Sequence, residues 1–592
     1  MRLRRLLLAI PAALCLIAAP PDGAALYKAR CAACHDGAPQ GRMPGRSELA
    51  AKTPEFIFDA MFHGAMTQQA AGLSQEEGRA VARYLTGKEF AASINTAAAG
   101  KCSAPAPQFS LADGDWNGWG IDPGNSHYQR HPGLSASDVA KLKLKWAFGF
   151  PNDARAWAQP TVAGGRIFAG SMSGNVYSLD ARTGCIYWSF AATAGVRSAV
   201  IIGKLPNGKW AAYFGDQRAT TYAVDVETGA LLWKIKIDDH PVAGITGAPV
   251  LSNGRLYVPI SSISEEAAAM NPNYPCCTFR GSVSALDAAT GKLIWKTYTV
   301  PDPAKPYKTN SKGTQLYGPA GVAVWSAPTI DLKRKRLYAS GGNSYTGVPI
   351  NTSDSILAFD LETGRLLWAS QVQPNDNFII GCPNNPNCPE EAGPDFDFGT
   401  STILKTLPDG KDILIAGQKS GVVYGLDPDD KGKILWQKRL GKGSALGGVE
   451  WGHAADDHLV YAAISDRLVR NDGAPGLYAL DLATGEQKWF APPADVPGMK
   501  GHSAAVSVIP GVVFSGALNG RFSAYSAENG AILWNFDTNR KFDTVNGVDA
   551  KGGSIDGPGP TIAHGMVYVN SGYGLFGGVP GNVLLAFSID GK

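Results

Sequence analysis

Apolar and polar residues alternate along most of this 592-residue chain, and the alternation is organised in one repeated unit. In residues 177–188, YSLDARTGCIYW, two alternating stretches flank an Asp-x-x-Thr-Gly turn. Gly supplies the positive φ of such a turn and Asp or Thr can bond its amides, so the unit predicts a β-hairpin. Its final Trp can bury a large apolar face against a neighbouring unit. Similar units occupy residues 222–233, 283–295, 356–368, 424–436, 478–489 and 522–534, and an eighth, 585–591, ends before its Trp.

The repeat predicts the fold class. Hairpins that recur in this way, with no helical pattern between them, indicate stacked β-sheet units, and eight units predict an all-β eight-bladed propeller. Residues 141–148, KLKLKWAF, form a lone alternating stretch before the first full unit. We expect this strand to pair with the last unit and complete the eighth blade, because closure removes the open edges of the ring.

A different pattern precedes the propeller. Residues 1–25 begin with basic residues and continue into a short apolar stretch, which predicts a secretory signal peptide and a periplasmic protein. Helical periodicity follows, with helix starts predicted at Thr53-Pro54-Glu55 and at the capping box of Ser74 and Glu77. We expect a small all-α domain over residues 26–95, a linker over 96–107 and the propeller over 108–592. No later segment is apolar enough to predict a membrane span.

Composition and cysteine count narrow the range of functions. The net charge is only +3 and the one short basic run is residues 333–336, which argues against nucleic acid as a partner. Of the nine Cys residues, one lies in the predicted signal peptide and two belong to a Cys-x-x-Cys-His motif. The six that remain predict disulfides in an exported protein. Cys382 and Cys388 bracket one loop, which a disulfide between them would close. Cys276 and Cys277 form a disulfide either with each other or with other cysteines. A disulfide between Cys102 and Cys185 follows only by elimination.

The segment Cys31-Ala-Ala-Cys34-His35 carries the clearest chemistry. Two thiols at this spacing can attach haem through its vinyl groups, and the adjacent imidazole can ligate the iron. A redox dithiol or half a zinc site fits less well, because the domain shows neither a βαβ pattern nor a second ligand pair. The segment resembles the class I c-type cytochromes, in which a Met before the last helix also ligates iron. The resemblance assigns this role to Met66, with Met43, Met61 and His63 as the other candidates.

Residues 110–592 resemble the quinoprotein alcohol dehydrogenases through the opening motif 115–127, DWNGWGIDPGNSH, and through all the Trp units. The fused cytochrome and the adjacent Cys276 and Cys277 are most similar to the polyvinyl-alcohol dehydrogenase (cytochrome) branch. The resemblance implies a propeller that holds pyrroloquinoline quinone (PQQ) and a metal ion at its centre. One feature departs from the better-known alcohol enzymes, in which the Cys pair precedes the Arg that corresponds to Arg197. Here the pair follows Glu265, so a contact with PQQ is not implied.

The resemblance places the metal site in three segments that interrupt the repeat. Glu265, with Glu266 as the alternative, follows a strand, and Asn343 lies in Ser-Gly-Gly-Asn. Asp376 follows the fourth Trp unit, where the resemblance implies the catalytic base and a metal ligand. Without the resemblance, Glu265 and Glu266 would also fit a solvated charge pair, and the segments of Asn343 and Asp376 would fit ordinary turns. Oxygen ligands of this kind predict Ca²⁺.

Contacts to PQQ are also assigned by the resemblance. PQQ carries three carboxylates, which require cations and hydrogen-bond donors. Arg197 corresponds to a carboxylate-binding Arg, Thr246 to a donor, Lys419 to the basic residue near the quinone oxygens, and Trp325 to the floor beneath the ring. For Arg197 and Thr246 alone a surface or turn role would fit as well, but all four occur in the family order.

Together these residues predict an exported alcohol dehydrogenase. Asp376 would accept the hydroxyl proton while hydride passes to PQQ, and haem c would pass electrons to an external soluble or membrane-bound cytochrome c. The expected substrate is an alcohol, with secondary or polymeric alcohols such as polyvinyl alcohol as specific candidates. Two alternatives remain: a quinoprotein that acts on small alcohols or aldehydes, and a cofactor-free propeller scaffold. A scaffold would not need the haem motif or the predicted metal site.

Overall fold

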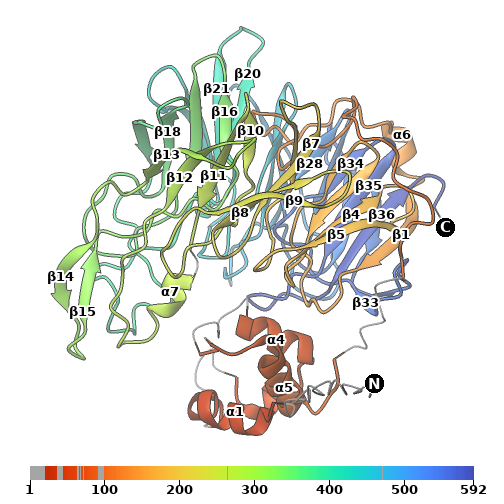
Figure 1. The fold of residues 1–592 in the computed structure, drawn as a ribbon. Helices are drawn as coiled ribbons and strands as arrows, with labels where there is room; N and C mark the ends of the chain where they lie inside the picture. The colour runs from red at the N-terminus through yellow and green to blue at the C-terminus, as the bar shows by residue number, and fades with distance from the viewer. Residues whose placement is uncertain are drawn as a thin grey trace, which may run out of the picture. The chain divides into compact units, whose positions relative to one another are not determined.

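The computed structural model describes residues 21–36, 44–62, 66, 69–70, 72–90, 99–262, 264–469 and 471–591. Most of the predicted signal peptide, and the alternative haem ligands Met43 and His63, lie outside these residues. The chain forms two compact units, Met1–Phe90 and Ala91–Lys592, each of which is described by itself (Figure 1). The predicted domain bounds at residues 95, 107 and 108 stay predictions.

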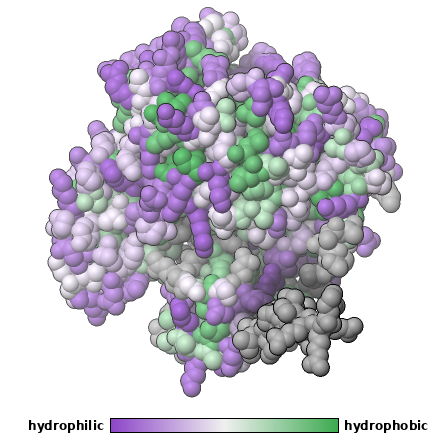
Figure 2. Space-filling model, in the orientation of Figure 1, coloured by the Kyte–Doolittle hydropathy of each residue, from purple (hydrophilic) through white to green (hydrophobic). Residues whose placement is uncertain are grey.

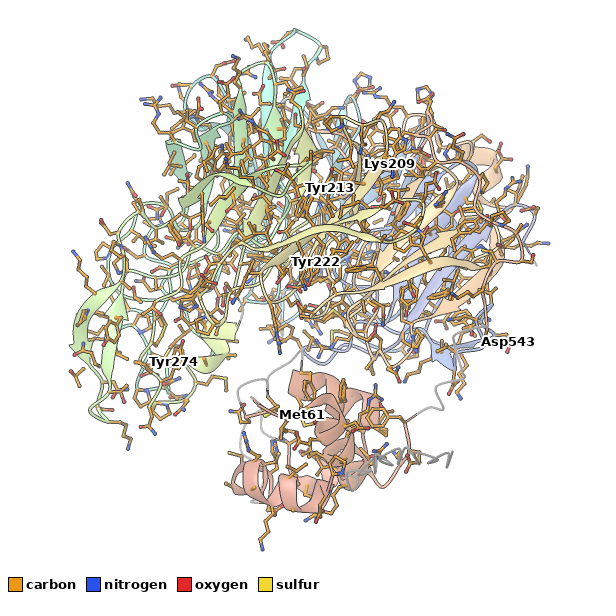
Figure 3. All side chains as sticks on the ribbon, viewed as in Figure 1. Met61, Lys209, Tyr213, Tyr222, Tyr274 and Asp543 are labelled. Atoms are coloured by element: carbon orange, nitrogen blue, oxygen red, sulfur yellow. A yellow bond between two sulfur atoms is a disulfide. The ribbon has the colours of Figure 1, made fainter. Side chains whose placement is uncertain are left out.

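The first unit is helical. Its two main helix starts are those that the sequence predicts: the Phe56 amide donates to Thr53 Oγ1 (3.2 Å), and Ser74 and Glu77 form the reciprocal capping box. Met61 is 5% exposed and lies in the apolar core, so it is a packing residue in this structure (Figure 3). The helices are α1 (Gly23–Arg30), α2 (Ala32–His35), α3 (Arg46–Ala50), α4 (Pro54–Phe62) and α5 (Gln75–Thr86).

The second unit contains eight four-stranded antiparallel sheets, which confirms the predicted eight-bladed propeller. The first two blades, each from its innermost to its outermost strand, are β2 (Thr161–Ala163), β3 (Arg166–Gly170), β4 (Asn175–Asp180), β5 (Ile186–Ala191), and β6 (Ile201–Lys204), β7 (Trp210–Gly215), β8 (Thr220–Asp225), β9 (Leu231–Lys236). The next two are β10 (Val250–Ser252), β11 (Arg255–Ile260), β12 (Ser282–Asp287), β13 (Leu293–Tyr298), and β16 (Thr329–Asp331), β17 (Arg336–Ser340), β18 (Ser355–Asp360), β19 (Leu366–Gln371).

Blades five and six are β20 (Ile403–Thr406), β21 (Asp412–Gly417), β22 (Val422–Asp427), β23 (Lys433–Arg439), and β24 (Ala454–Ala455), β25 (Leu459–Ile464), β26 (Gly476–Asp481), β27 (Gln487–Ala491). Blade seven is β28 (Ser507–Ile509), β29 (Val512–Gly516), β30 (Arg521–Ser526), β31 (Ile532–Asp537). Outside the blades lie α6 (Ala136–Val139), α7 (Ser264–Ala268) and two hairpins, β14 (Lys305–Thr309) with β15 (Gln315–Gly318) and β32 (Lys541–Phe542) with β33 (Ala550–Lys551).

The eighth blade closes the ring as the sequence predicts. It combines β34 (Thr561–Ala563), β35 (Met566–Ser571) and β36 (Val583–Ser588) with β1 (Lys143–Gly149), the strand that precedes the first blade. Trp146 of β1 pairs with Ala586 of β36 and so supplies the Trp that the last unit lacks. The innermost strands β34 and β2 are in contact, so the eighth blade lies next to the first.

Pairing between blades explains why Gly and Trp recur together. Gly229 has φ +72°, and a Cβ there would lie 2.7 Å from the Trp188 ring of the preceding blade. Trp188 Nε1 in turn donates to the Val226 carbonyl (2.8 Å). The repeated turn therefore needs Gly both for its backbone conformation and for the close approach of the indole. The same close approach of a turn Gly to an indole ring joins Trp146 to Gly184, Trp233 to Gly291, Trp295 to Gly364, Trp368 to Gly432, Trp436 to Gly485 and Trp489 to Gly530.

Three disulfides join Cys102 to Cys185, Cys276 to Cys277 and Cys382 to Cys388, in agreement with the pairings considered from the sequence. Figure 2 shows apolar patches interspersed among polar residues on the visible face of the propeller. Within the described part of the chain, no helix combines the length and the apolar character needed to cross a membrane.

Candidate active site at the centre of the propeller

A cavity lies where the segments that lead into the innermost strands converge. Seven of its lining residues occupy equivalent places in blades one to six and eight, three or four residues before the innermost strand: Trp157, Arg197, Thr246, Trp325, Gly399, Trp451 and Gly557. The cavity volume is only about 30 Å³. The aromatic side chains thus leave a narrow slot between them, a shape that suits a flat ring.

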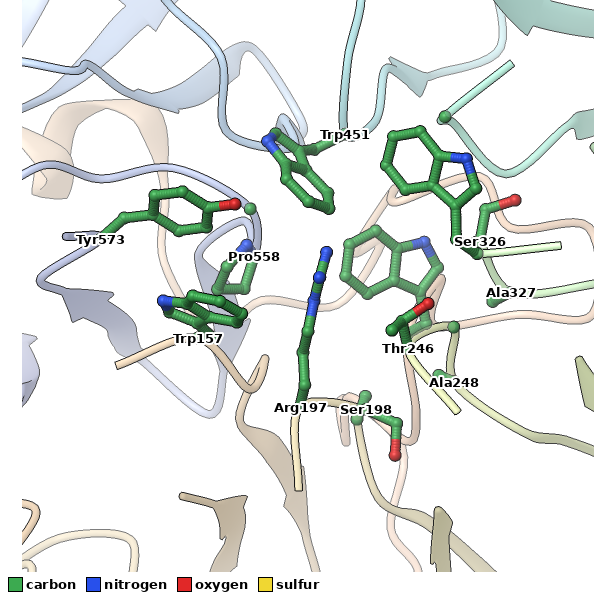
Figure 4. A pocket seen from close by; sticks show the side chains of 16 residues that line it. Trp157, Arg197, Ser198, Thr246, Ala248, Ser326, Ala327, Trp451, Pro558 and Tyr573 are labelled. Atoms are coloured by element: carbon green, nitrogen blue, oxygen red, sulfur yellow. The ribbon is translucent and has the colours of Figure 1, made fainter. Parts of the chain in front are cut away.

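Arg197 extends into the middle of this slot (Figure 4). Its guanidinium carbon lies 4.5 Å from the Trp451 ring centroid and 5.1 Å from that of Trp157. Burial lowers the pKa of Arg197, and the guanidinium makes no ion pair or side-chain hydrogen bond with the residues that the structure describes. The buried carboxyl nearby, Asp556, is instead paired with Arg467 (3.1 Å). A cation without an anion in an aromatic cavity is suited to bind an anionic ligand.

Lys419 supplies a second cation near the slot. Its Nζ lies 3.1 Å from Asp395 Oδ1, 2.8 Å from Asp397 Oδ2 and 5.4 Å from the Trp325 ring centroid. Burial by itself would lower the pKa of Lys419, but the two carboxylates outweigh it and raise the pKa well above its usual value. Lys419 is therefore charged and fixed beside the Trp325 ring. Thr246 also lines the slot, with its Oγ1 donating to Ser261 Oγ (3.1 Å).

Asp376 and Asn343 lie in adjoining loops, since the Ser344 amide donates to the Asp376 carbonyl (3.0 Å). The Asp376 carboxylate accepts from the amides of Asp395 (2.9 Å) and Phe396 (2.6 Å), which fix its orientation. Burial raises the pKa of Asp376, partly against these two hydrogen bonds, and Asp397 raises it further. A buried carboxylate with a raised pKa is a stronger base than an exposed Asp.

Two hydrogen bonds from the side-chain nitrogen fix the orientation of the Asn343 side-chain amide. Nδ2 donates to the carbonyls of Ser344 (3.0 Å) and Phe378 (2.9 Å), and the backbone amide donates to Asp397 Oδ1 (2.5 Å). These bonds direct the side-chain nitrogen to the backbone and leave the side-chain oxygen for another partner. An amide oxygen held in this way can act as a ligand for a hard cation.

The two acids at the start of α7 have different surroundings. Glu265 is fully buried, and its carboxylate accepts from Tyr274 Oη (3.1 Å) and from the amides of Thr278 (2.8 Å) and Phe279 (2.8 Å). It therefore holds together the loop that follows α7, where Tyr274 is seen in Figure 3. Glu266 instead interacts with the groups around Asp376: burial, Asp397 and Asp376 together raise its pKa to about 8, with Lys419 opposing the shift. The prediction of Glu265 as a metal ligand is untested, but it is Glu266 that faces the acidic side of the site.

Sequence reasoning missed several residues of this site. Trp157 and Trp451 could have been found, because they occupy the same repeat position as Trp325. Asp395 and Asp397 lie in a long loop without a repeat pattern, so nothing in their spacing marked them. Asp354 is fully buried beside these acids, and its carboxylate oxygens have no hydrogen-bond partner among the described residues. Within that same part of the chain, no three His, Cys, Asp or Glu side chains form a metal-binding group by themselves.

The Cys-x-x-Cys-His segment of the helical unit has the features that haem attachment requires. Cys31 and Cys34 are free thiols, and Cys34 is exposed. His35 is 7% exposed, and its Nδ1 lies 2.8 Å from the Pro44 carbonyl oxygen, which leaves Nε2 to ligate iron. Met66 is partly buried against the core of the helical unit. Its role as the second ligand stays a prediction.

Comparison with known proteins decides the family. A polyvinylalcohol dehydrogenase of Pseudomonas sp is 46% identical over 97% of this chain and 94% of its own length. A second, from Sphingopyxis sp. (strain 113P3), is 44% identical over 96% of this chain and 93% of its own length. The chain belongs to the polyvinylalcohol dehydrogenase family. The resemblance seen in the sequence is thereby confirmed, and membership in an enzyme family decides against the cofactor-free scaffold.

Family models agree with this assignment for both units. Residues 18–85 match the model described as cytochrome C oxidase, cbb3-type, subunit III, and residues 207–388 match that of the glucose/ethanol/alcohol dehydrogenase β-propeller domain. The repeated propeller units also match the model described as outer membrane protein assembly factor BamB, over residues 127–274, 419–495 and 476–591. A quinohemoprotein alcohol dehydrogenase of Pseudomonas putida has a similar fold, with a TM-score of 0.62 over 81% of each chain at 20% identity.

Proposed function

We propose that this polyvinylalcohol dehydrogenase family member oxidises hydroxyl groups of polyvinyl alcohol, or of a similar polymeric secondary alcohol, in the periplasm. As a member of the family, the chain is a PQQ- and haem-dependent alcohol dehydrogenase. The observation that carries the proposal is the unpaired Arg197 cation in an aromatic slot. On the side of Lys419 and Trp325 this slot adjoins the buried acids around Asp376. The residues present therefore fit a flat polyanionic cofactor at the centre of the ring.

PQQ supplies an acceptor for the hydride that leaves the alcohol carbon. Arg197 would bind a carboxylate of the cofactor, and the Trp325 and Trp451 rings, whose centroids are 5.2 Å apart, line the slot. Lys419, held by Asp395 and Asp397, places a fixed positive charge beside the Trp325 ring. These groups would orient the ring between the aromatic side chains of the slot.

Asp376 is the proposed general base. Its orientation is set before substrate binds, because the amides of Asp395 and Phe396 hold its two oxygens. Its raised pKa strengthens it as a proton acceptor for the substrate hydroxyl.

For Ca²⁺ we propose Asn343 and Asp376 as protein ligands together with a carboxylate from the α7 pair. The hydrogen bonds of Glu265 favour Glu266 for this last position, because the Glu265 oxygens already bind Tyr274, Thr278 and Phe279. A divalent cation would also offset the negative charge of Asp376, Asp397 and Glu266.

Haem c is the proposed exit for electrons, attached to Cys31 and Cys34 with His35 and Met66 as axial ligands. An external cytochrome c is the proposed acceptor. The Cys34→Ser variant tests this path, because it removes one thioether bond without changing the propeller. We expect oxidation of alcohol with a small dye to continue, and reduction of added cytochrome c to fall to background. Equal survival of both activities would show that the haem unit does not carry the electrons.

A further inference from the structure

A second cavity lies away from the central slot, on the loops that carry the site. It is lined by Val300, Pro301 and Asp302, by Pro319, and by residues 348–352, and we call it the side groove. Pro319 follows the end of the β14–β15 hairpin, which projects from the body of the propeller (Figure 1). The volume of the groove is about 450 Å³, within the range of small-ligand sites.

The lining of the side groove combines apolar and hydrogen-bonding groups. Val300, Pro301, Pro319, Val348, Pro349 and Ile350 supply the apolar surface, whereas Asp302, Asn351 and Thr352 supply polar atoms. Thr352 is only 2% exposed, and its Oγ1 has no hydrogen-bond partner among the residues described. A buried hydroxyl without a partner is costly, and a ligand that brings a hydrogen-bonding group to Thr352 Oγ1 would remove this cost.

One loop connects the side groove to the active site. Residues 341–354 join β17 to β18, and Asn343 near the start of this loop lies beside Asp397 and Asp376. The loop then forms one wall of the groove with residues 348–352 and returns to the acids at Asp354. The same loop therefore contributes residues to both places.

We infer that the side groove binds a stretch of the polymeric substrate while another hydroxyl of the same polymer chain lies at the active site. This inference rests on the proposed function. Polyvinyl alcohol alternates methylene and hydroxyl-bearing carbons, so its methylenes match the Pro, Val and Ile surface and its hydroxyls match Thr352, Asn351 and Asp302. A small alcohol cannot reach both places. Attachment at the groove raises the effective concentration of hydroxyl groups at the active site, and this gain exists only for long substrates.

Thr352→Val tests the inference, because it removes the hydroxyl and keeps the shape of the side chain. Thr346→Val is the matched control: Thr346 lies on the same loop, is also 2% exposed and has an Oγ1 without a partner in the described structure, but it does not line the groove. The holoenzymes are compared on polyvinyl alcohol of increasing chain length and on pentane-2,4-diol, which has only two hydroxyl groups.

In Thr352→Val we expect KM for long polymer to rise about fivefold, the factor of one ordinary hydrogen bond, with kcat and the diol kinetics unchanged. Thr352→Ser should restore the wild-type KM, and Thr346→Val should leave it unchanged. Pro349→Glu, which places a charge on the exposed apolar wall, should raise KM further and reduce retardation of the holoenzyme in gels that contain polyvinyl alcohol. A wild-type enzyme that gains nothing from chain length would overturn both the polymer assignment and the groove. A gain that persists unchanged in Thr352→Val and Pro349→Glu would overturn the groove alone.

Discussion

Two arginines near the central slot should respond differently to substitution by Met. Arg467→Met should lower the stability of the fold, whereas Arg197→Met should weaken the binding of PQQ. Arg467 is paired with Asp556 at 3.1 Å, donates to the carbonyls of Leu575 (3.0 Å) and Phe576 (2.7 Å), and has a side chain that is 3% exposed. Arg197 has no ion pair in the described structure, and its guanidinium lies over the rings of Trp157 and Trp451. Arg467 thus stabilises the folded protein, whereas Arg197 is the proposed partner of a PQQ carboxylate.

The magnitudes follow from these contacts. Arg467→Met leaves the buried carboxyl of Asp556 without its cation, a loss that typically costs about 3–5 kcal/mol of unfolding free energy. Arg197→Met removes a buried charge together with its cation–π contacts, two effects of opposite sign that are each about 1–2 kcal/mol, so the cofactor-free protein should change by less than about 1 kcal/mol. Loss of one charge-assisted hydrogen bond to a PQQ carboxylate is worth about 1.5–3 kcal/mol, which corresponds to roughly 10- to 150-fold weaker PQQ binding.

The assay pairs urea unfolding of the cofactor-free proteins with titration of PQQ in the presence of Ca²⁺. The expected pattern is a large loss of stability only in Arg467→Met, and a large loss of PQQ affinity in an otherwise stable Arg197→Met. The reasoning is refuted if Arg197→Met binds PQQ as the wild type does, or if it unfolds as readily as Arg467→Met.

Three further predictions concern the acids of the site and one buried histidine. Asp376→Asn should still bind PQQ but lose about 10²–10⁴-fold in kcat, because an amide cannot accept the proton; a twofold loss would reduce Asp376 to a turn residue. Glu266→Gln should weaken Ca²⁺ activation while Glu265→Gln mainly lowers the melting temperature, and the reverse result would return the ligand role to Glu265. His502 is buried with its pKa lowered to about 4, so it is neutral when folded and charged when unfolded below its ordinary pKa of about 6.5. Its contribution to stability is present above pH 6.5 and is lost as the pH falls toward 4. Between pH 7 and pH 5 the unfolding free energy of His502→Gln should therefore fall by about 2 kcal/mol less than that of the wild type. Equal decreases in urea unfolding would contradict this.

The propeller was predictable because one local pattern decides it. The turn Gly and the outer-strand Trp contact each other across blades, as Gly229 and Trp188 do, so each repeat carries both halves of the interface. The closing strand was also predictable, because Trp146 stands where the last unit lacks its Trp. These Gly and Trp positions recur at regular places in each repeat, so they can be recognised from the sequence alone.

The acidic side of the site was less predictable because its loops have no period. Glu265 and Glu266 are adjacent in sequence, yet only the packing of α7 determines that one binds backbone amides and the other faces Asp397. Asp395 and Asp397 come together with Lys419 only through the folding of the loop that leads into β20. Contacts of this kind depend on the three-dimensional path of a loop, which residue spacing does not encode.

The most direct test of the central claim is dye-linked alcohol oxidation by the purified protein, with and without added PQQ and Ca²⁺. The substrates are long polyvinyl alcohol, pentane-2,4-diol and ethanol. The account predicts no oxidation without PQQ, oxidation of the secondary alcohols once PQQ and Ca²⁺ are added, and the highest kcat/KM per hydroxyl group for the long polymer. Oxidation that does not depend on PQQ, or no oxidation of any of the three alcohols by the PQQ-loaded protein, would contradict it.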